Sequence, residues 1–166
     1  RHLVVLAAAV AMAEAVETTT GVHAVLKWPN DLLVGNRKLA GILAEAVDDA
    51  VVVGIGVNLD WPSVPDELEG IATACNLEGG RPVTREVLLD GFLAGYSARL
   101  DDLPAARIAY VARLDTLGRN VRVERADGPL TGIARDLDAD GRLIVQTETG
   151  VIETISAGDV VHLRPI

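Results

Sequence analysis

The chain has little cysteine, few aromatic residues and few positive charges, and each shortage narrows what it can do. Its single cysteine, Cys75, permits neither an internal disulfide nor a cysteine metal cluster, which is compatible with a reducing cytosol. Aromatic residues make up 3% of the 166 residues, so the core must consist of Val, Leu, Ala and Ile. A formal charge of −9 argues against binding a nucleic-acid backbone, which requires basic patches.

Metal-ligand spacings and membrane segments are also missing from the sequence. The three histidines, at positions 2, 23 and 162, do not have the spacing of a metal site. The longest apolar run, residues 3–13, is too short to span a bilayer and has no basic leader. We therefore expect a cytoplasmic chain without a membrane partner, in which Cys75 is a small buried apolar side chain.

Periodicity and turn signals predict an α+β fold for the first two thirds of the chain. The Ala-rich and Leu-rich residues 3–16 favour a mostly buried helix that stops at Gly21. Strands are expected at residues 23–28, 32–34, 38–47 and 51–58. After a turn-rich segment with one helical turn near Ile71, helices are expected behind the N-cap Thr84 and from Pro104 to Leu117.

The pattern changes near residue 120 to short apolar runs separated by turns, two of them Asp-Gly. These runs predict strands at residues 121–124, 130–137, 143–147, 151–155 and 160–163. Their regular spacing indicates a small antiparallel barrel. We place a domain boundary at Gly118, which separates a domain of residues 1–117 from one of residues 118–166.

Two lysines eleven positions apart frame the most informative stretch of the sequence. Lys27 opens the segment Lys27-Trp28-Pro29-Asn30-Asp31, and Lys38 opens an apolar run that predicts a buried strand. Two cations and one carboxylate on short strands and turns can steady the phosphates and metal ion of a nucleotide. The alternative is structural, with Lys27 at a solvated strand end and Arg37-Lys38 at the polar tip of a hairpin.

The amino-acid sequence of this stretch resembles a motif of a known protein family. The segment KWPNDLLVGNRKLAGILAEA resembles the central motif of biotin protein ligases, with matches at Lys27, Asn30, Asp31, Lys38, Gly41, Ile42, Leu43 and Glu45. GIGVNLDWP, residues 54–62, resembles the family's glycine-isoleucine-glycine-X-asparagine strand and follows at the right distance. The resemblance implies a class II synthetase-like core, with helices packed on a mixed or antiparallel sheet, followed by a small SH3-like β-barrel.

The resemblance also implies a two-step reaction. Biotin and ATP would first form biotinyl-5'-AMP with the help of Mg²⁺, and a lysine of a biotin carboxyl carrier protein would then accept the biotin. Lys38 would span the biotin carboxylate and the α-phosphate, Lys27 would act on the phosphate side, and Asp31 would be the metal ligand. Asp31 could instead cap the Pro29 turn.

The remaining binding roles follow from the same motif positions. The implied biotin-binding residues are Lys38, Gly41, Leu43, Gly54 and Gly56, and the implied ATP or adenylate residues are Lys27, Asn30, Asn58 and Arg164. Alternative explanations remain for several of them. Asn58 fits a turn-forming asparagine at a strand end, and the glycines could relieve a packing contact. Trp28 is expected in the core.

One feature of the family is missing. The GRGRxG biotin loop should precede KWPND, and the sequence does not contain it. We therefore expect residues 1–166 to be a fragment that lacks one wall of the biotin pocket and binds biotin poorly. Two other functions stay open. A lipoate protein ligase shares the architecture, although KWPND favours biotin, and the missing loop favours a non-catalytic adenylate-binding or docking module.

Overall fold

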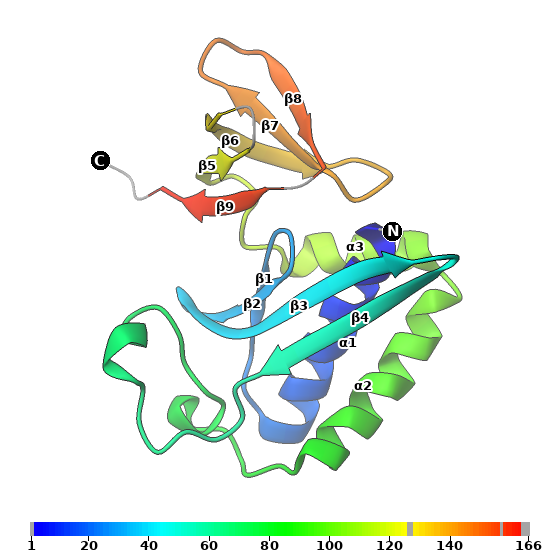
Figure 1. Ribbon diagram of the computed structural model, residues 1–166, viewed down its shortest axis with the longest axis vertical. Coiled ribbons are helices and arrows are strands. Elements are labelled where there is room, and N and C mark those ends of the chain that lie inside the picture. Colours follow the sequence, from blue (N-terminus) through cyan, green and yellow to red (C-terminus); the bar gives the residue numbers. More distant parts are fainter. Residues whose placement is uncertain (1, 126–127, 157, 164–166) are drawn as a thin grey trace.

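The computed structural model describes residues 2–125, 128–156 and 158–163, which form helices packed on one antiparallel sheet and a second antiparallel sheet beyond them (Figure 1). The helices are α1 (His2–Thr20), α2 (Arg85–Leu100) and α3 (Leu103–Arg113). The first sheet has the order β1 (Val25–Lys27), β2 (Asp31–Val34), β3 (Arg37–Val47) and β4 (Ala50–Val57). The α+β class with antiparallel sheets is confirmed.

The second sheet is built from the C-terminal strands. Their bounds are β5 (Asn120–Glu124), β6 (Leu130–Leu137), β7 (Leu143–Thr147), β8 (Ile152–Ile155) and β9 (Asp159–His162). They lie in the order β8-β7-β6-β5-β9. The predicted bounds of these strands agree with the observed ones to within one or two residues. The predicted barrel is not closed, because within the described residues the edge strand β8 pairs only with β7 and the edge strand β9 only with β5.

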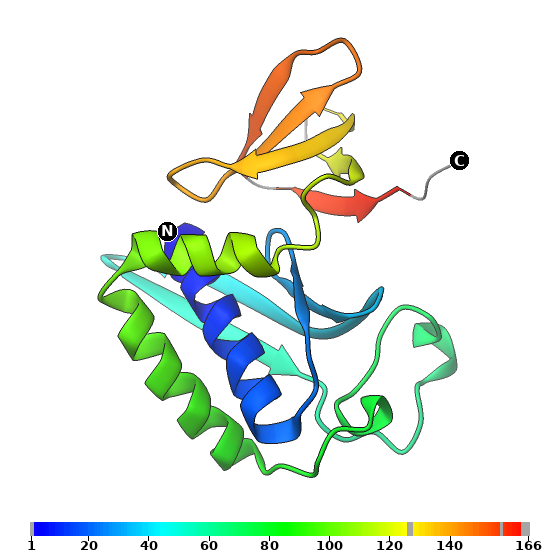
Figure 2. The ribbon, with the colours of Figure 1, turned by 180° about the vertical axis from the view of Figure 1, so that it is seen from behind.

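Helix α1 is the centre of the first layer (Figure 2). Eleven of its nineteen residues are buried, from Leu6 to Thr20, and it packs against both α2 and α3. It ends at Thr20, directly before the predicted stop at Gly21, whose φ of +83° suits glycine. Its length and composition would allow it to cross a membrane, but most of that stretch is buried inside the protein, as in an ordinary core helix.

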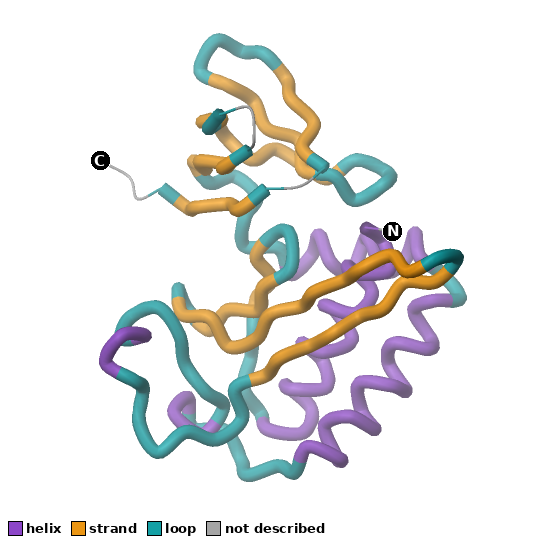
Figure 3. The backbone as a smooth tube through the Cα atoms, in the orientation of Figure 1, coloured by secondary structure: helices purple, strands orange, loops and turns teal. Residues whose placement is uncertain are grey.

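Helix α3 ends earlier than predicted because the residues that follow it form backbone contacts with β1. Leu114 takes an extended conformation and bridges Leu26 in parallel, and the Asp115 amide donates to the Leu26 carbonyl at 2.8 Å. These bonds compete with continuation of the helix to Leu117. The chain therefore runs beside β1 before it enters the second sheet (Figure 3).

The connection between β4 and α2 also differs from the prediction. Its helical turns are 3₁₀ turns at Asp66–Leu68 and Asn76–Glu78, and neither is centred on Ile71. The backbone around Ile71 is instead used for pairing with β3, since the Lys38 amide donates to the Ile71 carbonyl at 2.8 Å. The N-cap Thr84 is confirmed, and its hydroxyl accepts from the Val87 amide.

The two sheets are fastened together by the turn between β6 and β7, residues 138–142. The Trp28 indole, 1% exposed, donates to the Gly141 carbonyl at 3.1 Å. From α3, the Arg107 guanidinium donates to the carbonyls of Asp138, at 2.6 Å, and Leu137. Gly141 has a φ of +84°, a left-handed conformation that favours glycine, and it lies against the Leu6 side chain. The motif segment is therefore anchored to the second sheet.

Replacing Trp28 with Phe should lower the free energy of unfolding by about 1–3 kcal/mol, because the buried Gly141 carbonyl loses its donor. Urea unfolding followed by circular dichroism measures this loss. Trp61→Phe is the matched control: Trp61 is only partly buried, and we expect a change within about 0.5 kcal/mol. Equal effects of the two substitutions would show that the indole hydrogen bond does not fasten the sheets.

Candidate active site

Strand register places four of the predicted residues in one row across the first sheet. Lys27 of β1 pairs with Asp31 of β2, Asp31 pairs with Gly41 of β3, and Gly41 pairs with Gly56 of β4. Directly paired residues present their side chains on the same face of a sheet. The register therefore gathers two charged groups and a glycine floor on one face.

Leu43 and Gly54 extend this floor by one further pair. Leu43 is 64% exposed, and along β4 the residues at 52, 54 and 56 are exposed while their neighbours turn toward the helices. The four residues expected to line a biotin slot, Gly41, Leu43, Gly54 and Gly56, thus lie together on the open face. Their role in binding stays a prediction.

The two lysines of the motif are the only lysines of the chain. Of the two, Lys38 forms an ion pair with Asp31. Its ammonium lies 2.5 Å from Asp31 Oδ1. The lysine side chain crosses directly over Gly41, where a Cβ would approach Lys38 Cε to 2.9 Å and Nζ to 3.0 Å. Gly41 therefore provides the space in which the Lys38 ammonium reaches Asp31.

The backbone of Lys38 is held from the other side by the connection after β4. Besides the bond to Ile71, the Lys38 carbonyl accepts from the Thr73 amide at 2.9 Å. The Asn58 carboxamide bridges the same two segments, donating to the Thr73 carbonyl at 2.9 Å and to the Lys38 carbonyl at 3.4 Å. Asn58 thus fixes the start of β3, and its predicted contact with the adenylate remains untested.

The Pro29 turn is secured by buried groups from later in the chain. The Trp28 amide donates to the Thr116 hydroxyl at 3.0 Å, and the Tyr110 hydroxyl donates to the Pro29 carbonyl at 3.3 Å. Complete burial, with the Asp31 carboxylate nearby, raises the pKa of Tyr110 far above its usual value, so this hydroxyl stays protonated. Asn30 faces β3 and donates to the Ile42 carbonyl at 2.7 Å.

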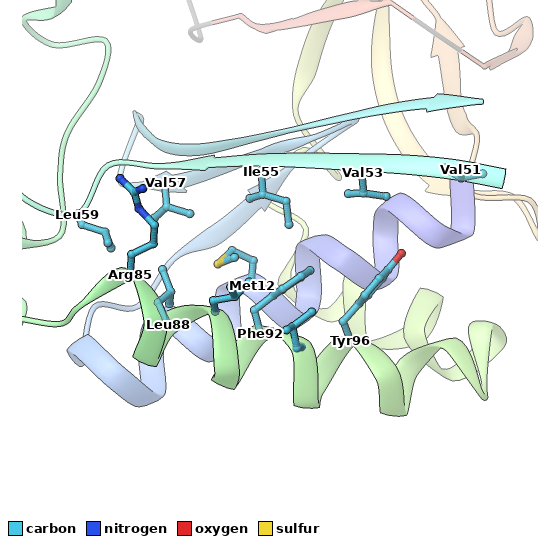
Figure 4. A pocket seen from close by; sticks show the side chains of 12 residues that line it. Met12, Val51, Val53, Ile55, Val57, Leu59, Arg85, Leu88, Phe92 and Tyr96 are labelled. Carbon is cyan, nitrogen blue, oxygen red and sulfur yellow. The ribbon is translucent and has the colours of Figure 1, made fainter. Parts of the chain in front are cut away.

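An apolar cavity of about 490 Å³ lies on the opposite face of the sheet, between β4 and α2 (Figure 4). Val53, Ile55 and Val57 point into it from β4, and Phe92 and Tyr96 face them from α2. Its lining is apolar except for Arg85 and the Tyr96 hydroxyl, and it contains none of the predicted site residues. The reactive groups and this cavity are therefore on different faces.

Asp31 fits the requirements of a magnesium ligand only in part. Its Oδ1 is buried and lacks a hydrogen-bond partner of good geometry, although the Lys38 ammonium is close enough for an ion pair. Among the described residues, no group of three His, Cys, Asp or Glu side chains could hold a metal ion. Mg²⁺ takes few ligands from protein and the rest from water and phosphates, so one carboxylate suits it if a nucleotide is bound.

A second, polar cleft of about 580 Å³ opens between the two sheets. Lys27 of β1, Arg119 before β5 and His162 of β9 line it. Arg119 and His162 were not among the predicted site residues, because neither belongs to a motif and the two lie 43 positions apart in the sequence. Arg164, expected to contact the nucleotide, lies outside the described residues.

Both ends of the chain match known families. Residues 1–60 match the Biotin/lipoate A/B protein ligase family, and residues 116–163 match the Biotin protein ligase C terminal domain. The two matches contain the KWPND segment and the second sheet, respectively. They leave out the connection and helices α2 and α3 between them.

Individual relatives agree with these matches. The chain is 41% identical to the biotin–[acetyl-CoA-carboxylase] ligase of Mycobacterium tuberculosis over 84% of its own length and 53% of that protein. It is 30% identical to the bifunctional ligase/repressor BirA of Bacillus subtilis over 92% of its own length and 50% of that protein. The chain thus spans about half the length of these relatives.

Solved structures show that the likeness extends to the fold. The biotin protein ligase of Aquifex aeolicus in complex with biotin and ATP superposes with a TM-score of 0.84 at 27% identity, over 99% of this chain and 72% of that one. Its apo structure gives 0.87 at 26% identity, over 98% of this chain and 76% of that one. Because sequence and fold agree from one end of the chain to the other, the chain belongs to the biotin protein ligase family.

Proposed function

We propose that the protein is an ATP-dependent biotin protein ligase that forms biotinyl-5'-AMP and transfers biotin to a lysine of a biotin carboxyl carrier protein. The observation that carries this proposal is the row from Lys27 through Asp31 and Gly41 to Gly56, with Lys38 over Gly41. One end of this arrangement carries the two lysines and the Asp31 carboxylate. The other end is the exposed surface formed by Gly41 and Gly56. An anionic small molecule lying on that floor would place its carboxylate at Lys38.

In the adenylation step, biotin's carboxylate attacks the α-phosphate of ATP and pyrophosphate leaves. Lys38 would hold the two anions together, which favours attack and stabilises the charge that develops on the phosphate oxygens. To do so it must leave Asp31, its partner at 2.5 Å. The freed Asp31 carboxylate would hold Mg²⁺, and the ion when bound neutralises charge on the phosphates.

In the transfer step, the ε-amine of the carrier lysine attacks the adenylate carbonyl and AMP leaves. Asn30 and Asn58 are the proposed adenylate contacts. Their amide nitrogens are engaged with the backbone carbonyls of Ile42, Thr73 and Lys38. Each carboxamide oxygen would then remain as the acceptor for an adenine or ribose donor. Arg164 is proposed as a further nucleotide contact.

Finer structural assignments accompany this function. We assign residues 1–117 to the C-terminal part of a class II synthetase-like catalytic domain and residues 118–166 to an SH3-like domain. The two family matches and the separation of the two sheets support this division. The reaction is assigned to the cytoplasm, where ATP and carrier domains are available.

The function is tested by ATP–pyrophosphate exchange in the full-length protein. We expect exchange to depend on biotin and to be absent with lipoate. Lys38→Ala should lower the rate by about a hundredfold or more, because a preorganised charge is lost from the transition state. Its thermal melt should change little, since Lys38 is about half exposed and its ion pair with Asp31 is only partly desolvated. Exchange supported by lipoate alone would identify a lipoate ligase, and exchange with neither acid would indicate a non-catalytic module.

Gly41→Ala should lower the exchange rate by between about tenfold and about a hundredfold, because its methyl group would push the Lys38 ammonium out of place. The backbone of Gly41 does not require glycine, so folding should be retained, as a thermal melt would show. Gly91→Ala, in α2, is the control: its Cβ meets only ordinary contacts, and activity should be unchanged. Wild-type exchange in Gly41→Ala would separate Lys38 from the chemistry.

Asp31→Asn should raise the magnesium concentration needed for half-maximal adenylation by at least about tenfold, since substitutions around metal ligands commonly cost that much affinity. The substitution keeps size and hydrogen-bonding capacity and removes only the charged oxygen ligand. A magnesium titration of single-turnover adenylation measures the change. Reduced activity with an unaltered magnesium dependence would assign Asp31 to the turn instead.

A further inference from the structure

The cleft between the two sheets brings together three basic side chains, one of which, Arg119, is paired with Asp115. Lys27, Arg119 and His162 line it, together with apolar groups such as Leu33 and Val161. Within the described part of the chain no carboxylate pairs with the Lys27 ammonium. In a chain whose formal charge is −9, such a gathering of basic groups indicates a site for an anion.

Arg119 is already oriented by the protein. Its Nε donates to the Asp115 carbonyl at 2.7 Å and its Nη2 to Asp115 Oδ1 at 2.6 Å. These bonds engage one edge of the guanidinium. Among the described residues none accepts a hydrogen bond from Nη1, so this group would offer a phosphate in the cleft an oriented and always charged donor.

His162 completes the wall from β9. Its Nε2 lies 3.1 Å from the Thr116 hydroxyl, which also accepts from the Trp28 amide, and its Nδ1 lies 3.9 Å from Asp115 Oδ2. Burial lowers the pKa of His162, Arg119 and Lys27 lower it further, and Asp115 opposes them. The lowered pKa favours the neutral ring, and an anion that offsets those two cations would raise the pKa again.

We infer that Arg119, with Lys27 and His162, binds the pyrophosphate portion of the nucleotide in the cleft between the two sheets. The inference rests on the proposed function and adds Arg119 and His162 to its site. Lys27 stands at one end of the catalytic row and also lines the cleft, so it connects the two. A nucleotide whose α-phosphate meets Lys38 would extend its β- and γ-phosphates past Lys27 toward Arg119.

The test measures binding of inorganic pyrophosphate to the full-length protein by calorimetry, without biotin or carrier. Arg119→Gln should weaken binding by at least about tenfold, the loss expected for one charge-assisted hydrogen bond. The matched control is Arg122→Gln, which removes the same charge from β5, where Arg122 pairs with Glu124 at 2.7 Å. Equal affinities of these two variants would overturn the inference.

A second variant, Asp115→Asn, tests the site through a gain of pyrophosphate binding, which misfolding would not produce. It keeps an acceptor for Arg119 and removes the negative charge beside it, so pyrophosphate should bind more tightly than to the wild type. In addition, pyrophosphate should raise the apparent pKa of the His162 ring, followed by NMR and assigned with His162→Gln. Unchanged or weaker binding by Asp115→Asn, or a His162 titration that ignores pyrophosphate, would contradict the assignment.

Kinetics distinguish this inference from the proposed function. Arg119→Gln should raise the KM for ATP in the adenylation step by at least about tenfold. It should leave transfer from preformed biotinyl-adenylate to the carrier unchanged, because that step involves no pyrophosphate. Biotin-dependent exchange with normal pyrophosphate binding in Arg119→Gln would refute only the inference. Arg119-dependent pyrophosphate binding without any biotin-dependent exchange would refute only the proposed function.

Discussion

The pairing register of the first sheet is the constraint on which the candidate site depends. Side chains alternate between the two faces of a strand, so a slip of one residue between β2 and β3 would move Gly41 away from Asp31 and turn the site toward the helices. The register is enforced by burial, since Leu32, Leu39 and Ile42 are buried in the core. It is also enforced by hydrogen bonds on both sides of Gly41 along β3, between Asn30 and Ile42 and from Ile71 and Thr73 to Lys38. The same strand register thus buries the core residues and positions the charged side chains.

The Pro29 turn carries this constraint from the first sheet to the second. Trp28 is bound on its amide by Thr116 and on its indole by Gly141, and both partners lie more than 80 residues further along the chain. Thr116 in turn meets His162 of β9. A displacement of the second sheet would therefore be felt at Lys27, one residue before Trp28. This continuity would allow the cleft between the sheets and the row across the first sheet to bind the same ligand, as we propose.

Much of this arrangement could be predicted from sequence because local signals determine it. The strand signals at residues 38–47 and 51–58 and the Thr84 cap identify elements to within a few residues, and the KWPND motif identifies the charged groups. The end of α3 could not be predicted, since Leu114 leaves the helix to bond with a strand 88 residues earlier. For the same reason Arg119 and His162 went unrecognised: they gain meaning only from the folding of β5 and β9 against each other and beside β1. Asn58 fitted both a turn and a ligand contact, and the structure shows a backbone clamp that is compatible with either.

The ion pair between Lys38 and Asp31 can be replaced by other charged partners when a substrate binds. Lys38 is about half exposed and its partner Asp31 mostly buried, so their ion pair is only partly desolvated and can be exchanged for another at modest cost. In the proposed reaction a substrate carboxylate replaces Asp31 at Lys38, and the released carboxylate meets a divalent cation. Each charge then exchanges one partner for another, and none is left alone in a water-poor site. Lys27 has no such internal partner among the described residues, so its compensation must come from solvent or from a bound anion. This asymmetry is consistent with the proposed roles, in which Lys38 would exchange Asp31 for a substrate carboxylate and Lys27 would hold the phosphates.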